Sequence, residues 1–148
     1  MTKSENAVNL FKQGYNCCQA VFCAFCQDFG INLETGLKLA SSFGGGMGGM
    51  REVCGAVSAM FMVLGLKYGY SVSDDVTLKK QHYNLIREAA KKFSEENGSI
   101  ICKELLGISK PKTDADYIPT ERNAEFFKKR PCVELVEYAA LVTEQLLH

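Results

Sequence analysis

Apolar residues recur at three- and four-residue spacing along most of the chain, which is the period of an amphipathic α-helix. No run shows the strict alternation between turn residues that is typical of a half-buried strand. The pattern predicts an all-α fold, with about six to seven helices bundled around one buried central helix. We expect residues 1–148 to form a single domain, because a chain of this length can bury about 68–70% of its unfolded surface around one core.

Cap residues and glycines predict where the helices begin and end. The first helix is expected to start at Ser4 and end at Gly14, the second to start at Asn16 and end at Gly30, and the third to cover residues 33–43. A helix over residues 53–68 is apolar on nearly every face and is therefore expected at the centre of the bundle. Further helices are predicted over residues 73–97, with Ser73 as the cap, over 99–107, and from Pro131 onward. Residues 108–120 are expected to be a surface connection, and 121–127 a further helical turn or two.

The glycine-rich stretch 44–49, GGGMGG, cannot form regular helix without a large entropic cost, and we expect a shaped loop. Gly44, Gly46 and Gly49 match GxGxxG literally, but a helix rather than a strand precedes them, which excludes a dinucleotide fingerprint. The stretch contains no lysine, so it is not a P-loop either. We expect no nucleotide; the backbone N–H groups could instead bind an anion or donate to a sulfur.

Charge and composition narrow the class of partner. The 17 basic and 17 acidic residues balance, so no electrostatic attraction to nucleic acid is expected. The N-terminal residues carry no targeting segment, and the longest nearly apolar run, 53–66, is shorter than the ~20 residues that cross a bilayer. We expect a cytoplasmic protein that does not span a membrane and that could form a homo-oligomer.

Seven cysteines in a reducing compartment point to chemistry rather than to structural disulfides. Four of them share one kind of position: Cys17, Cys102 and Cys132 fall in the first turn of a predicted helix, and Cys54 lies at or near the start of the central helix. The positive end of a helix stabilises a thiolate and lowers its pKa. Because a thiolate is both the nucleophile and the metal ligand, this set is the candidate site.

The other cysteines have simpler interpretations. Cys18 shares a helix face with three phenylalanines and is expected in the core. Cys23 and Cys26 form a literal CxxC, but they lie in the middle of a predicted helix on its polar side, so we interpret the motif as accidental. Gln27 stands where a haem attachment site needs histidine, so no haem is expected.

Five segments together resemble the C_GCAxxG_C_C family of small redox-active proteins: residues 14–21 (GYNCCQAV), 43–47 (FGGGM), 54–56 (CGA), 99–107 (SIICKELLG) and 130–132 (RPC). The resemblance implies that Cys17, Cys54, Cys102 and Cys132 are the four defining cysteines. Ala59 replaces the last glycine of the CGAxxG motif. The resemblance also implies a redox partner connected with a membrane transporter.

Three hypotheses follow. In the first, Cys17, Cys54, Cys102 and Cys132 catalyse thiol–disulfide exchange, with three pairings open. In the second, the same four thiolates bind an iron–sulfur cluster or a zinc ion, although the spacing lacks the close CxxC pairs of common zinc and ferredoxin sites. In the third, the domain binds a partner and its thiols are idle. The first two hypotheses require that the four cysteines converge, whereas the third does not.

Overall fold

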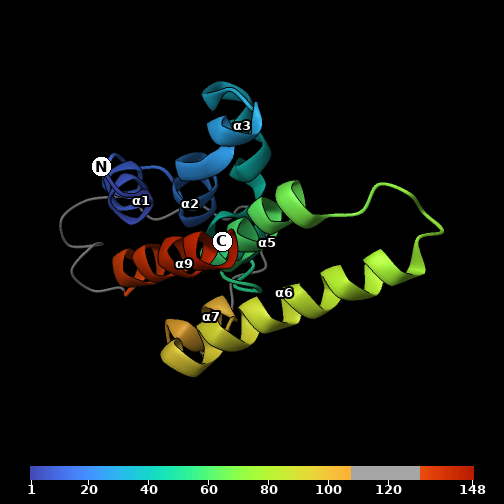
Figure 1. The fold of residues 1–148 in the computed structure, drawn as a ribbon. Helices are drawn as coiled ribbons and strands as arrows, with labels where there is room; N and C mark the ends of the chain where they lie inside the picture. The colour runs from blue at the N-terminus through green and yellow to red at the C-terminus, as the bar shows by residue number, and fades with distance from the viewer. Residues whose placement is uncertain (108–130) are drawn as a thin grey trace.

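The structure, a computed structural model, describes residues 1–107 and 131–148. The described residues are helical and form no sheet, which confirms the predicted all-α class (Figure 1). The elements are α1 (Lys3–Lys12), α2 (Cys17–Phe25), η1 (Cys26–Phe29), α3 (Leu33–Ala40), η2 (Ser41–Phe43), α4 (Gly44–Met47), α5 (Gly55–Tyr68), α6 (Val76–Asn97), α7 (Cys102–Leu105) and α9 (Cys132–Leu146). The connection expected over 108–120 and the turns expected over 121–127 lie outside the described residues.

Helix α5 is the buried centre of the fold, as its apolar sequence predicts. It packs against α2, α9 and α6, and α1 covers the outer side of α2 and α9 (Figure 1). Val57, Ala59, Met60 and Val63 of α5 are fully enclosed. The start of α5 is therefore surrounded by other segments, and this arrangement decides where the candidate site lies.

Four predicted helix starts are wrong by two residues. Helix α5 begins at Gly55 rather than at residue 53, and the cap position of α7 is Ile101 rather than Ser99. Helix α1 is capped by Thr2 rather than Ser4: the Glu5 N–H donates to Thr2 Oγ1 at 3.1 Å and the Thr2 N–H donates to the Glu5 carboxylate at 3.1 Å. Helix α6 is capped by Asp75 rather than Ser73, because the Asp75 carboxylate accepts the Leu78 N–H at 2.9 Å. In α1 and α6 the side chain of the cap residue accepts the backbone N–H of the residue three positions later.

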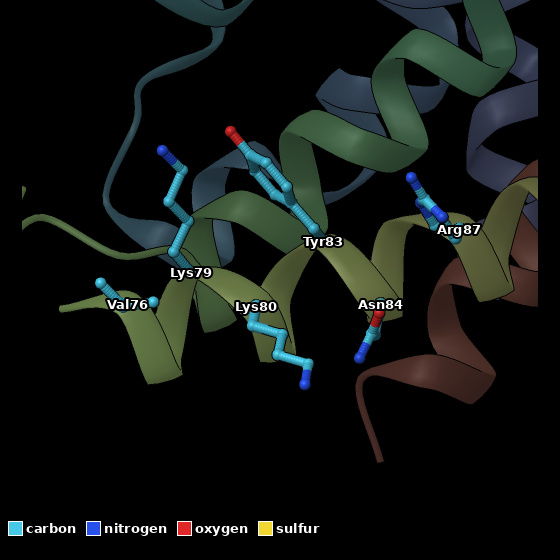
Figure 2. A pocket seen from close by; sticks show the side chains of 6 residues that line it. All are labelled: Val76, Lys79, Lys80, Tyr83, Asn84 and Arg87. Carbon is cyan, nitrogen blue, oxygen red and sulfur yellow. The ribbon is translucent and has the colours of Figure 1, made fainter.

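Helix α6 extends away from the bundle at its N-terminal end (Figure 1). A hollow of about 360 Å³ lies along this exposed part. Figure 2 shows that its side chains diverge, since Lys79 and Tyr83 point to one side of the helix and Lys80 and Asn84 to the other. Side chains that diverge do not build a reactive centre, so the candidate site is elsewhere. None of the described helices combines the length and the apolar character needed to cross a bilayer.

Candidate functional site

The four cysteines singled out by the sequence occupy equivalent positions in the structure. Cys17, Cys102 and Cys132 are the first residues of α2, α7 and α9, and Cys54 is the residue that caps α5. The Asn16 cap predicted for α2 is confirmed, since the Asn16 side chain accepts the Gln19 N–H at 2.9 Å. We call Cys17, Cys54, Cys102 and Cys132 the four-cysteine set.

The start of α5 brings these segments together. A Cβ placed on Gly55 would lie 3.2 Å from Cys17 Cβ and 3.0 Å from the Cys18 backbone nitrogen. Only glycine therefore lets the beginnings of α2 and α5 approach so closely. Cys102 and Cys132 lie close enough to the neighbouring Cys54 thiol for their charges to raise its pKa. The structure thus places all four cysteines around one end of α5.

A short antiparallel contact fixes Cys54 relative to Cys102. Val53 and Ile101 form an isolated β-bridge, and on either side of it the Cys54 N–H donates to the Ile100 carbonyl at 2.8 Å and the Cys102 N–H donates to the Glu52 carbonyl at 2.6 Å. Side chains two positions apart point to the same face of such a pair. Cys54 and Cys102 are therefore held on one face, diagonally across the bridge.

The glycine-rich stretch explains how α7 comes so close. It is not regular right-handed helix, as predicted: Gly45, Gly46, Met47 and Gly48 all have φ between 64° and 71°, and together they form a left-handed turn. Left-handed backbone is strained for residues with a Cβ, which is why glycine dominates here. A Cβ on Gly46 would lie 2.7 Å from Cys102 Cβ, so this glycine also makes room for α7.

Arg51 belongs to the site, and sequence reasoning missed it. It is 8% exposed, has a positive φ of 61°, and its guanidinium donates a hydrogen bond to Cys102 Sγ at 3.6 Å. Hydrogen bonds from a guanidinium are stronger when the acceptor is charged. The only hint in the sequence is that an arginine lies two residues after the glycine-rich stretch 44–49, and this does not indicate which side chain it meets.

Burial dominates the ionisation of Cys54. Burial is the largest cause: against the lowering effect of the Val57 and Ala56 backbone N–H groups, and with a smaller contribution from the charges of Cys102 and Cys132, it raises the pKa of the thiol to about 12. The helix-start effect predicted from the sequence is therefore present, but in this structure the loss of solvation outweighs it. Cys54 is a protonated thiol at neutral pH in this conformation.

The four-cysteine set has suitable ligand atoms for a metal site, but its side chains are not arranged around a common point in the described part of the chain. Four thiols suit zinc or an iron–sulfur cluster. Among the residues that the structure describes, however, no three His, Cys, Asp or Glu side chains come together as metal ligands would. Ser58, one helical turn after Cys54, is buried, and its hydroxyl oxygen has no hydrogen-bond partner within the described part of the chain. The site thus contains an unsatisfied polar atom beside its thiols.

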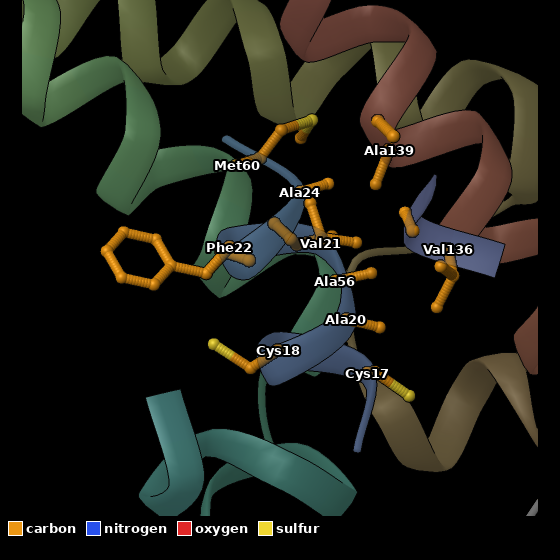
Figure 3. Close-up of a cluster of buried hydrophobic side chains, with 14 of the residues drawn as sticks. Cys17, Cys18, Ala20, Val21, Phe22, Ala24, Ala56, Met60, Val136 and Ala139 are labelled. Carbon is orange, nitrogen blue, oxygen red and sulfur yellow. The ribbon is translucent and has the colours of Figure 1, made fainter. Parts of the chain in front are cut away.

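The remaining cysteines are buried outside this set. Cys18 is fully buried in the core, as predicted, and its sulfur lies 3.7 Å from Met62 Sδ; Figure 3 shows Cys17 and Cys18 pointing to different sides of the start of α2. The prediction that Cys23 and Cys26 lie on a polar face is wrong. Helix α3 covers both residues and leaves them 4% and 0% exposed. All seven cysteines are free thiols.

Comparison with known proteins gives one result. A family model described as "Putative redox-active protein (C_GCAxxG_C_C)" matches residues 15–146, and all four members of the set lie inside the matched region. Searches of the curated proteins and of the solved structures found no match. The redox description therefore comes from the family, and the chemistry must be argued from the residues.

Proposed function

We propose, since this chain belongs to the C_GCAxxG_C_C family of redox-active proteins, that the four-cysteine set carries out thiol–disulfide exchange. Cys102 is the attacking residue and Cys54 is the resolving residue. The observation that carries the proposal is the β-bridge between Val53 and Ile101, which holds these two cysteines on one face, diagonally across the bridge. Diagonal neighbours are about 7–8 Å apart, so closing a disulfide between them needs a small movement of the backbone.

The two thiols have different surroundings, which supports different roles. Both thiols are buried, but the Cys102 sulfur accepts a hydrogen bond from Arg51, whereas burial raises the pKa of Cys54 to about 12. An attacking cysteine needs stabilised negative charge, and a resolving cysteine needs only to reach the mixed disulfide. Cys17 and Cys132, beside them, are the candidates for a second pair.

The reaction balances with a disulfide-containing partner. The Cys102 thiolate attacks one sulfur of the partner disulfide, forms a mixed disulfide and releases one partner thiolate. The Cys54 thiol then loses its proton and attacks the Cys102 sulfur, which releases the second partner thiol. Two electrons pass to the partner, two protons follow them, and a Cys54–Cys102 disulfide remains. The reverse reaction oxidises a dithiol partner.

The test is a trapping experiment with oxidised glutathione on protein purified without oxygen. In wild type, peptide mapping should find a disulfide between Cys54 and Cys102. Cys54→Ser should instead accumulate one glutathione on Cys102, because the resolving thiol is gone. Cys102→Ser should prevent both products. Cys18→Ser, a change at a buried cysteine outside the set, should behave as wild type.

Two results would overturn this assignment. If Cys54 and Cys102 both remain thiols in oxidised glutathione while the protein stays folded, the set is not a dithiol couple under these conditions. If the anaerobically purified protein contains iron or zinc in stoichiometric amount and Cys54→Ser loses it, the four thiolates are ligands instead. Metal analysis and a visible spectrum of the same samples distinguish the two outcomes.

A further inference from the structure

A second pair of cysteines lies at the other end of α2. Cys23 is in the last turns of α2 and Cys26 begins η1; along the helix axis they lie about 9 Å and about 13.5 Å from Cys17, at 1.5 Å per residue. Residues three positions apart are neighbours on one face of a helix, and the Cys26 N–H still donates to the Phe22 carbonyl as in an α-helix, so the two thiols lie on the same face. The pair is too far from the start of α5 to belong to the four-cysteine set.

Helix α3 is shaped to fit both sulfurs. A Cβ placed on Gly36 would lie 2.7 Å from Cys26 Sγ and 3.2 Å from Cys23 Sγ. A glycine inside a helix costs about 1 kcal/mol relative to alanine, so its presence here needs a local reason. The local reason is that both sulfurs contact α3 at Gly36, where a side chain would collide with them.

The two thiols interact with each other and are not equivalent. Burial is the main cause that raises the pKa of both thiols, and together with the contact from Cys26 it raises that of Cys23 to about 12. The same contact, and the backbone N–H groups of Cys26 and Gln27, act to lower the pKa of Cys26. Cys26 is therefore the better nucleophile of the pair, and Cys23 the proton donor beside it.

We propose that Cys23 and Cys26 form a second dithiol–disulfide couple, distinct from the four-cysteine set and independent of whether that set is redox-active. With a disulfide oxidant, the Cys26 thiolate forms a mixed disulfide and releases one thiolate. Cys23 then attacks Cys26 and releases the second thiol. Two electrons and two protons pass to the oxidant, and the Cys23–Cys26 bond closes a single helical turn.

Access to the pair is through α3. This helix buries only Gly36 and Ala40, and its Leu33 and Leu39 are 40% and 51% exposed. The Gln19 side chain holds it to α2 by donating to the Leu37 carbonyl at 3.1 Å. Few buried apolar contacts mean a small cost of local opening. Lifting α3 uncovers both sulfurs without disturbing α5.

The experiment uses the full chain with Cys54→Ser, which disables the dithiol chemistry proposed for the four-cysteine set. The protein is equilibrated in glutathione buffers from fully reduced to fully oxidised, quenched with acid and alkylated, and Cys23 and Cys26 are read by fragment mass spectrometry. As the buffer becomes more oxidising, alkylation of Cys23 and of Cys26 should decrease together, as expected for a two-electron couple. Adding Cys23→Ser should instead leave one glutathione on Cys26. Circular dichroism checks that each variant keeps its helices.

A third variant tests the contact itself. Gly36→Ala inserts a methyl group against both sulfurs and should shift the midpoint of the Cys23–Cys26 couple several-fold in glutathione ratio, while Leu39→Ala, on the exposed face of α3, should leave it unchanged. If Cys23 and Cys26 stay fully alkylated at every glutathione ratio in a folded protein, the pair is ordinary core and the proposal fails. That failure leaves the Cys54–Cys102 result in wild type untouched, so the two proposals are judged separately.

Discussion

At the scale of single residues, Arg51 is a buried charged group in contact with Cys102. Its guanidinium donates to Cys102 Sγ at 3.6 Å, and hydrogen bonds to charged groups contribute about 1.5–3 kcal/mol. Arg51→Gln removes the charge, so the rate at which iodoacetamide alkylates Cys102 at neutral pH should fall about tenfold. Labelling followed by peptide mass spectrometry measures this rate for each cysteine separately.

The control for Arg51→Gln is the same change of charge at an exposed position. Arg87→Gln, on the exposed hollow of α6, should leave the alkylation rate of Cys102 as in wild type. An unchanged rate in Arg51→Gln would mean that the guanidinium plays no part in activating this thiol, and the attacking role would then have to pass to another member of the set.

The sequence predicts some of these residues and not others for a physical reason. The helix-start positions of Cys17, Cys102 and Cys132 follow from neighbouring caps and glycines, which are local signals. The contact between Arg51 and Cys102 joins residues that are 51 positions apart and depends on a positive φ at Arg51, for which the sequence carries no signal. The burial of Cys26 likewise depends on α3 folding back over it.

At the scale of elements, glycines decide how closely the helices of the site approach. Gly55→Ala would place a methyl group 3.0 Å from the backbone of Cys18 and of Phe43, so α2 and α5 must separate. We expect this change to lower the free energy of unfolding by about 1–3 kcal/mol, the usual cost of overpacking. Urea denaturation followed by circular dichroism measures the loss.

Gly65 provides a matched control in the same helix. A Cβ there would meet nothing within 4 Å, so Gly65→Ala should be neutral or stabilising by up to about 1 kcal/mol from helix propensity. Equal effects of the two alanines would contradict a close approach of α2 to α5 at Gly55. The sequence predicts α5 as central because its apolar residues cover nearly every face, but it does not reveal which of its glycines are contact points.

At the scale of the whole molecule, the family resemblance and the helical pattern predict the all-α class and the central helix correctly. The left-handed turn at Gly45–Gly48 and the placement of α7 against it are not predicted, because both arise from packing between distant segments. One property of the fold as a whole follows from this packing. The protein buries Cys18, Cys23, Cys26 and Cys54 as neutral thiols, so its stability must depend on pH.

The sign of this dependence follows from the direction of the shifts. Burial raises the pKa of Cys54 and of Cys23 to about 12, and it also raises the pKa values of Cys18 and Cys26. In the unfolded chain these thiols ionise near the ordinary value of 9.0, whereas in the folded protein they stay neutral. Their contribution to the free energy of unfolding is therefore fully present below pH 9. It is lost as the pH rises from 9 toward 12, by up to about 1.4 kcal/mol per pH unit for each thiol.

Urea denaturation of the reduced protein at pH values from about 7.5 to about 10.5 tests this. Lysines and tyrosines also titrate in this range, so the informative quantity is the difference between wild type and Cys54→Ala. Because the variant lacks one neutral buried thiol, its stability should fall less steeply above pH 9, by close to one proton in the slope. If the two slopes agree, Cys54 ionises as easily in the folded protein as in the unfolded chain. The positive end of α5 would then have overcome the burial, and Cys54 rather than Cys102 would become the candidate for the attacking thiolate.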